Sequence, residues 1–276
     1  MFLQPFARWS NKQFIRTISK MSYNISIAGK SIPVQPASSD LDIKPVFEFQ
    51  PFKDWCSTFE KELSHSKDIK INSIQVQNVD YFKGGKPGFV KFKADVELTE
   101  SGKKVPGIVF MRGGAVSVLI VLRASDDKEK GDRVLFALQP RIPVPSAQLP
   151  ELPAGMLDGS GNFSGTAAQE IEEETGLKIK DDELVDMTEL AYGDKWRGVY
   201  PSAGGSDEFL RLFYCAKSMP TKEIDELEGK LTGLREHGEA ITLKVVKLED
   251  AWKLSPDAKL LSSLALLDAL KRTGKL

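Results

Sequence analysis

The sequence predicts a mixed α/β (α+β) protein, in which a helix–sheet–helix sandwich follows a small N-terminal antiparallel β-sheet region. Three observations support this fold class. Apolar and polar residues alternate over 74–79 and 90–98, as they do in half-buried strands. The run 115–122 is nearly all apolar, which indicates a central strand. Residues 258–272 return to helical spacing, so a closing helix is expected to pack on the later strands.

The first segment, 1–39, contains no acidic residue and five basic ones. An acid-free start that bears arginine and serine is typical of a mitochondrial targeting peptide, so we expect a mitochondrial protein. The alternative is a disordered tail that carries no address. Met21 offers an internal start, from which a shorter cytoplasmic form would arise.

The next region, 40–104, is expected to be rich in β-structure. It opens with helical spacing over 52–63, after which the period changes to that of strands. A glycine-rich turn over 84–88 separates the two alternating strands, 74–79 and 90–98, so we expect them to pair antiparallel.

The remaining residues, 105–276, are expected to form a second module. A charged hairpin loop occupies 126–132, and five prolines between positions 140 and 153 predict an extended approach to a helix at 166–175. Ser164 is the candidate N-cap of that helix, and Gly176 ends it. The other strands of the module are expected over 108–110, 134–138, 184–191, 209–216 and 241–246.

Composition excludes several classes of function. The net charge of −1 lacks the basic surplus of nucleic-acid-binding proteins, so no nucleic-acid partner is expected. No apolar run approaches the roughly 18 residues of a membrane span, so no membrane partner is expected either. The two cysteines, Cys56 and Cys215, are too few for a disulfide framework or a cysteine-rich metal site.

The most informative chemistry lies on the helix expected at 166–175. Glu170, Glu173 and Glu174 stand at i, i+3 and i+4, so all three carboxylates share one helix face. Their mutual repulsion costs helix stability unless a cation lies among them, and hard ions such as Mg²⁺ bind carboxylate oxygens. The plainer alternative is a solvated acidic surface.

The segment 155–177 resembles the Nudix box, whose pattern is G-x5-E-x7-R-E-U-x-E-E-x-G-U, where U is aliphatic. Gly161 stands where the pattern has its first Glu, and Gln169 stands where it has Arg. In the family this Arg orients the glutamates, and a neutral Gln replaces only part of that role. The resemblance implies a Nudix-type fold and a Mg²⁺ site, in which Mn²⁺ could substitute. The implied metal ligands are Glu170, Glu173, Glu174 and the backbone carbonyl of Ala154.

Further segments resemble those of ADP-ribose and ADP-sugar pyrophosphatases, namely 112–116, 139–141, 151–155, 201–208 and 233–239. By that resemblance the substrate-binding residues are Arg112, Arg141, Gly204, Gly205 and Glu208.

The general base must reach the attacking water, and mobile loops often close to achieve this. The segment 233–239 supplies Glu239 and Glu236, of which Glu239 ranks slightly higher. Glu173 is expected to act in catalysis as well as at the metal. Trp196 and Tyr200 either stack on adenine or pack against the protein.

Together these resemblances imply a nucleoside-diphosphate-sugar pyrophosphatase (diphosphatase) that hydrolyses ADP-ribose or ADP-glucose to AMP and a sugar phosphate. They also imply a homodimer supported by the N-terminal sheet, with a small-molecule nucleotide sugar as its partner. One alternative is a Nudix hydrolase of another nucleotide diphosphate, such as a dinucleotide polyphosphate or capped RNA. A second is a degenerate domain that binds ADP-sugars without hydrolysing them. Retention of all three helix carboxylates favours an enzyme.

Overall fold

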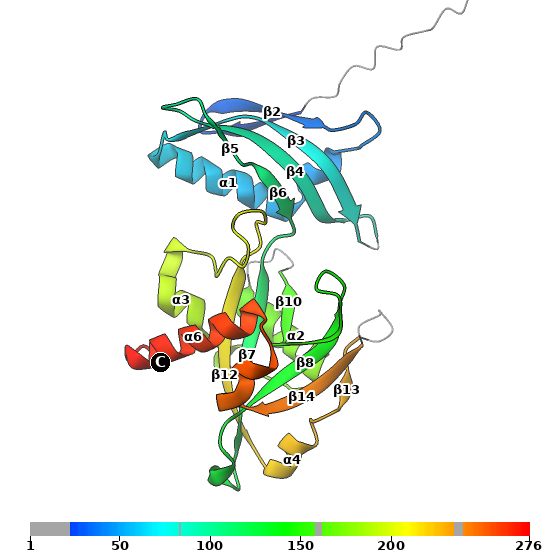
Figure 1. The fold of residues 1–276 in the computed structure, drawn as a ribbon, viewed down its shortest axis with the longest axis vertical. Helices are drawn as coiled ribbons and strands as arrows, with labels where there is room; N and C mark the ends of the chain where they lie inside the picture. Colours follow the sequence, from blue (N-terminus) through cyan, green and yellow to red (C-terminus); the bar gives the residue numbers. More distant parts are fainter. Residues whose placement is uncertain (1–22, 83, 158–161, 235–239) are drawn as a thin grey trace, which may run out of the picture.

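The protein consists of two modules, each built on its own β-sheet and stacked end to end (Figure 1). The computed structural model describes residues 23–82, 84–157, 162–234 and 240–276. Within these ranges no helix has the length and apolar character needed to cross a membrane.

The first module is a six-stranded sheet covered on one face by a helix. Its strands follow the order β1-β2-β3-β4-β5, and β6 also pairs with β4. The long β3–β4 pair is antiparallel, as the alternating pattern predicted. Phe52 and Trp55 of the covering helix pack edge-on against Phe92 of β4. The elements are β1 (Tyr23–Ile27), β2 (Lys30–Pro36), a 3-10 turn (Lys44–Glu48), α1 (Gln50–His65), β3 (Ile69–Tyr81), β4 (Pro87–Leu98), β5 (Lys104–Val105) and β6 (Ile108–Met111).

Two expectations for this part of the chain are wrong. Residues 23–36, assigned to a targeting or disordered segment, form the β1–β2 hairpin. Positive φ angles at Ala28 and Gly29 close its two-residue turn, and its own side chains Ile27, Ile32 and Val34 are buried. The strand at 108–110, expected in the second module, joins the first sheet instead. Residues 1–22 lie outside the described residues, so the targeting peptide stays a prediction.

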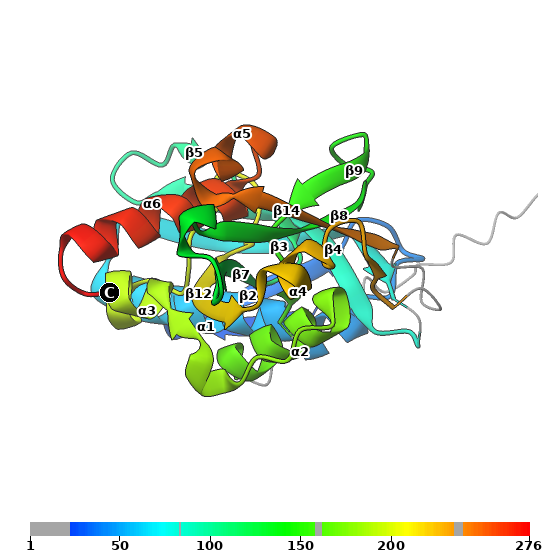
Figure 2. The ribbon, with the colours of Figure 1, turned by 90° about the horizontal axis from the view of Figure 1, so that it is seen from below.

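The second module is a sandwich of a mixed sheet between two helical layers (Figure 2), as predicted. Strand order is β11-β12-β7-β8-β14-β13, with β10 on β7 and β9 on β8. Helix α2 packs on one face through Ala167 and Ile171, and α6 packs on the other through Leu260 and Leu267. The elements are β7 (Ala115–Ala124), β8 (Arg133–Arg141), β9 (Ser146–Glu151), β10 (Ala154–Met156), α2 (Phe163–Thr175), β11 (Val185–Asp186), α3 (Met187–Tyr192), β12 (Leu210–Met219), α4 (Thr221–Asp225), β13 (Leu231–Thr232), β14 (Ile241–Lys247), α5 (Ala251–Leu254) and α6 (Ala258–Arg272).

A split in this sheet creates the site. Strand β7 pairs with β8 at Val121 and Leu122, near its end, whereas the start of β7 pairs with β10 instead. The short β10 therefore lies beside Ala115–Ser117, where the box helix passes over it.

Two local expectations in the second module are wrong. The strand expected at 184–191 covers only β11, because the Asp186 side chain accepts a hydrogen bond from the Glu189 N–H and starts helix α3. The cap of the box helix is Asn162, whose side chain accepts from the Gly165 N–H at 3.0 Å. The predicted cap, Ser164, lies inside the helix.

Candidate active site

The acidic face of α2 lies against β10. Burial of Ala167 and Ile171 fixes the rotation of the helix, and Gly176 ends it in the left-handed conformation at φ 75°. Glu170 lies over Gly155, where an added Cβ would come within 1.8 Å of the Glu170 carboxyl carbon. Glycine at this position therefore makes room for that carboxylate.

Glu174 is the buried member of the acidic face. Its side chain accepts a hydrogen bond from the Ala154 N–H at 3.1 Å, and the residue is only 6% exposed. Burial raises the pKa of Glu174 to about 8, against the lowering effects of the Ala154 N–H and of Arg141. The charges of Glu170 and Glu151 add to the increase. A metal-free Glu174 is therefore a carboxyl that holds its proton near neutral pH.

Glu173 is oriented by the residue that replaces the arginine of the box pattern. The Gln169 side-chain amide donates to the Glu173 carboxylate at 2.8 Å, one helical turn apart. Gln169 thus supplies the directional hydrogen bond expected of the arginine, without its charge.

These residues fit a hard divalent cation by their chemistry. Glu170 and Glu174 meet β10 at adjacent residues, Gly155 and Ala154, and two such carboxylates supply the oxygen ligands that a hard cation prefers. A cation there would displace the proton that burial places on Glu174. In the described part of the chain, however, no three His, Cys, Asp or Glu side chains are arranged as a ready metal site. The metal ligands therefore stay a prediction.

Arg141, expected to bind substrate, pairs with a buried carboxylate. Its Nε donates to Glu151 at 2.5 Å, and the other Glu151 oxygen accepts from the Lys259 ammonium group at 2.7 Å. Glu151 ends β9 and so leads directly into β10. Lys259 is not predicted from the sequence, where it is one of two lysines on a helix far along the chain.

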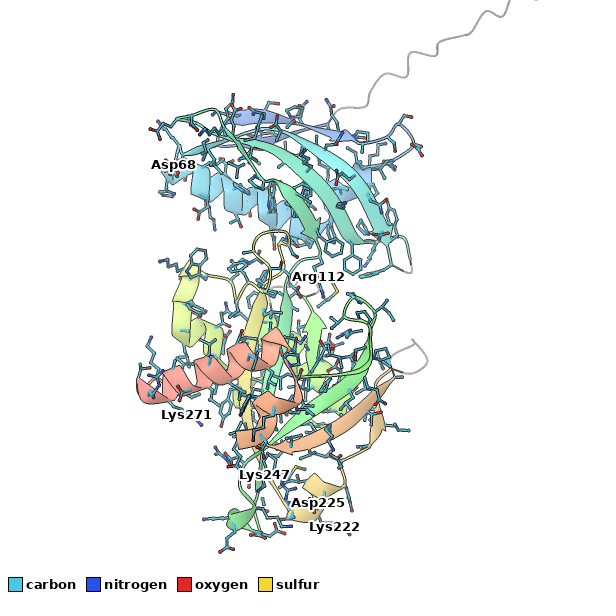
Figure 3. The ribbon with its side chains drawn as sticks, viewed as in Figure 1. Asp68, Arg112, Lys222, Asp225, Lys247 and Lys271 are labelled. Carbon is cyan, nitrogen blue, oxygen red and sulfur yellow. The ribbon has the colours of Figure 1, made fainter. Side chains whose placement is uncertain are left out.

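Arg112 lies where the two modules meet (Figure 3). Its backbone N–H and that of Gly113 donate to the Asp207 carboxylate at 2.8 and 3.1 Å, which ties the post-box loop to the start of β7. Burial raises the pKa of Asp207, while those two N–H groups lower it. The Arg112 guanidinium faces the predicted Glu208 at 3.4 Å.

The other predicted members of this loop are placed less tightly. Gly205 accepts a hydrogen bond from the Phe110 N–H of β6, which joins the loop to the first module. An added Cβ would meet nothing within 4 Å at Gly204 or Gly205, so no close packing demands glycine there. Glu236 and Glu239, the candidate general bases, lie outside the described residues.

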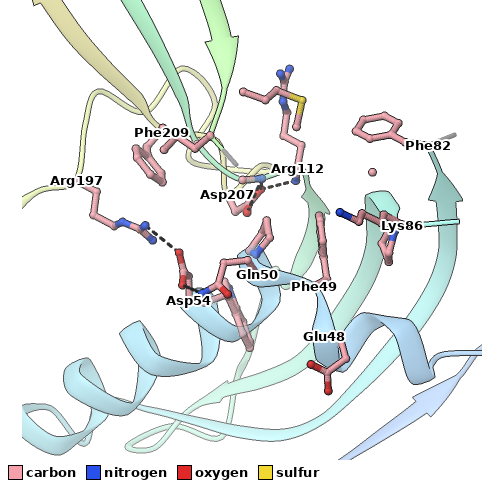
Figure 4. Close-up of a pocket in the computed structure, with 18 of the residues that line it drawn as sticks. Glu48, Phe49, Gln50, Asp54, Phe82, Lys86, Arg112, Arg197, Asp207 and Phe209 are labelled. Atoms are coloured by element: carbon pink, nitrogen blue, oxygen red, sulfur yellow. Dashed lines mark hydrogen bonds and ion pairs between the residues drawn. The ribbon is translucent and has the colours of Figure 1, made fainter. Parts of the chain in front are cut away.

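A cleft of about 1090 Å³ opens between the modules (Figure 4). An ion pair between Asp54 of α1 and Arg197 crosses it at 2.9 Å, and the Arg197 guanidinium lies 4.4 Å from the centre of the Phe209 ring. Tyr200 lines the cleft, while Trp196 packs edge-on against Tyr200. The walls combine apolar and charged side chains, among them Phe49, Gln50, Asp54, Trp55, Phe82, Lys86, Arg112, Met156, Phe163, Arg197, Tyr200, Asp207 and Phe209.

The structure thus places the predicted residues in two neighbouring areas. Glu170 and Glu174 of α2 lie against β10, with Arg141 near Glu174, whereas Arg112 lines the cleft. The cleft residues of the first module, Gln50 and Asp54, were not predicted, because no local pattern links them to positions more than a hundred residues later.

Comparison with known proteins identifies the family of the chain. The NUDIX domain matches residues 111–264 of the chain. Nudix hydrolase 14, chloroplastic, of Arabidopsis thaliana is 38% identical over 86% of this chain and 75% of its own length. An ADP-ribose pyrophosphatase of Haemophilus influenzae is 31% identical over 75% of this chain and 87% of its own length. The crystal structure of an ADP compounds hydrolase superposes with a TM-score of 0.49 at 14% identity, covering 76% of this chain and 98% of that one. The chain belongs to the Nudix hydrolase family.

Proposed function

We propose that the protein hydrolyses the diphosphate of an ADP-sugar, ADP-ribose or ADP-glucose, to AMP and a sugar phosphate in the presence of Mg²⁺. The observation that carries the proposal is the pair of carboxylates, Glu170 and Glu174, that lies on β10 beside Arg141. An acidic pair next to an arginine, with Glu174 buried and Glu170 partly exposed, suits a cation and the diphosphate that the cation binds. The relatives named as ADP-ribose pyrophosphatases support the choice of substrate.

Each residue has a distinct part in the proposed reaction. A divalent ion held by Glu170, Glu174 and the Ala154 carbonyl, with Glu173 close by, would neutralise phosphate charge and activate water. Gln169 keeps the Glu173 carboxylate in one orientation through its hydrogen bond. Arg141 and Arg112 are the candidate phosphate contacts, since a guanidinium fork matches phosphate oxygens.

The cleft between the modules is the candidate site for the nucleoside. It adjoins the site through Met156 at the end of β10 and Phe163 at the start of α2. Its aromatic walls, including Trp55 and Tyr200, suit a flat base, and Asp54 and Gln50 offer polar groups to fix its orientation. The general base remains the pair predicted from sequence, Glu239 ahead of Glu236.

The experiment is a panel of nucleotide sugars incubated with purified protein and Mg²⁺, with AMP release measured by chromatography. The panel contains ADP-ribose, ADP-glucose, GDP-mannose and a dinucleotide tetraphosphate. We expect the highest kcat/KM on an ADP-sugar. Binding of ADP-ribose without AMP release would favour the non-catalytic alternative, and preference for the tetraphosphate would favour another Nudix substrate.

Assembly and location are proposed with the same function. A homodimer through the N-terminal sheet agrees with the exposed apolar side chains of Ile108 and Phe110 on β6. Light scattering on a size-exclusion column would return the monomer mass of 30.6 kDa if this is wrong. An organellar, mitochondrial location rests on the acid-free start, and the relative named chloroplastic supports an organelle. Fractionation of cells that express the full chain or a form starting at Met21 tests it.

A further inference from the structure

Glu151 is a buried carboxylate held between two cations. Its side chain is 5% exposed, and each oxygen has a partner, Arg141 Nε on one and Lys259 Nζ on the other. A carboxylate at this depth is costly unless it is fully paired. Both cations therefore offset the cost of burying the Glu151 side chain.

Lys259 reaches Glu151 from the helical layer on the side of the sheet opposite to α2. It belongs to the first turn of α6, which packs on the sheet face away from α2. Its side chain is only 13% exposed and contacts Asp257 at 3.3 Å as well as Glu151 at 2.7 Å. A lysine this enclosed, with its ammonium group turned inward, is not an ordinary solvent-exposed charge.

The contact between Lys259 and Glu151 determines which nitrogens of Arg141 the Glu151 carboxylate uses. Its hydrogen bond to Glu151 uses Nε, so this carboxylate does not occupy the two Nη nitrogens of the guanidinium fork. The side chain is 39% exposed, and its charge lowers the pKa of the neighbouring Glu174. Were Lys259 absent, the second oxygen of Glu151 would lose its donor, and a guanidinium can satisfy both oxygens by turning its fork onto the carboxylate.

We propose that Lys259 is a positioning residue for the hydrolysis of the diphosphate. By holding Oε1 of Glu151, Lys259 restricts Arg141 to a single bond through Nε and leaves the Nη groups for phosphate oxygens. It also anchors the residue three positions before Ala154, whose backbone meets Glu174. This inference rests on the proposed function for its reaction, and on Glu151 and its two partners for its geometry.

The test is a double-mutant cycle between Lys259 and Arg141. We expect Lys259→Met to lower kcat/KM for ADP-ribose by about tenfold or more, the scale typical of residues that orient a site. In an Arg141→Gln background the same change should cost less than about twofold, since its target is already gone. Lys259→Arg should recover most of the loss because it restores a donor to Glu151. The matched control is Lys271→Met, at the far end of the same helix (Figure 3), which should leave kcat/KM unchanged.

A merely structural lysine would give a different pattern. The inference is overturned if Lys259→Met costs as much with Arg141→Gln as without it, or if activity follows the melting temperature across the four proteins of the cycle. A parallel double-mutant cycle measures, by calorimetry, the affinity for the non-hydrolysable α,β-methylene analogue of ADP-ribose. It distinguishes failure of the proposed function from failure of the positioning role. No hydrolysis by the wild type, together with a coupled loss of affinity, would refute the proposed function and keep the positioning role. Additive losses of affinity would refute the positioning role itself.

Discussion

Gly155→Ala tests the contact on which the acidic site depends. The new Cβ would lie 1.8 Å from the Glu170 carboxyl carbon and 1.9 Å from one of its oxygens. Ordinary carbon contacts are about 3.5–4 Å, so the carboxylate must move by roughly 2 Å. Errors of about 1 Å in a catalytic geometry cost on the order of 100-fold in rate. We therefore expect kcat to fall by about 100-fold or more, with a higher Mg²⁺ requirement.

The fold should tolerate this change. Glu170 is a partly exposed helix side chain that can adopt another rotamer, so the cost in unfolding free energy should stay near the roughly 1–3 kcal/mol of an overpacked site. AMP release from ADP-ribose as a function of Mg²⁺ measures the first effect, and thermal melts measure the second. Glu170→Gln supplies the reference, because Gly155→Ala added to it should cost little more. Activity within twofold of wild type for Gly155→Ala would refute the placement of Glu170.

Three further predictions follow from single contacts. In EDTA, the raised pKa of Glu174 means that the folded state binds an extra proton between the unfolded pKa, about 4.5, and about 8. The contribution of this group to the free energy of unfolding is therefore greatest at acid pH and declines as pH rises through that window. Denaturant titrations at several pH values should show that Glu174→Gln removes this decline. The same decline of the unfolding free energy with pH in Glu174→Gln and wild type would contradict the burial argument. Gln169→Arg should keep or raise kcat by adding charge to the hydrogen bond on Glu173, whereas Gln169→Ala should lower kcat. Equal kcat values for Gln169→Ala and the wild type would show that this hydrogen bond does not contribute to catalysis. Asp54→Ala should raise KM for ADP-ribose several-fold with little change in kcat, since it breaks the pair with Arg197 across the cleft and not at the carboxylates; a fall in kcat alone would place the nucleoside elsewhere.

The parts of this protein that could be predicted from sequence are those in which pattern and chemistry lie on neighbouring residues. Helix α6 has the bounds expected of it, and α2 carries its three carboxylates on one face at helical spacing. The bond between Gln169 and Glu173 also follows from that spacing, because residues four apart meet on a helix.

The parts that could not be predicted depend on which distant surface covers a residue. The apolar pattern at 108–110 shows that a strand is half-buried but not which sheet contains it, so β6 was assigned to the wrong module. The bond between Lys259 and Glu151 joins residues 108 positions apart, and the pair between Arg197 and Asp54 joins residues 143 apart. Neither contact has a local signal in the sequence.

The most direct test of the proposed site compares two isosteric changes on one helix. Glu174 faces β10 and is buried, whereas Glu172 has a side chain that is 54% exposed and pairs with Lys178. Each is changed to Gln, and AMP release from ADP-ribose is followed at saturating Mg²⁺. We expect Glu174→Gln to lose at least about 100-fold in kcat, and Glu172→Gln to match the wild type. Equal activity of the two variants would contradict a diphosphate-hydrolysing site on this face of α2.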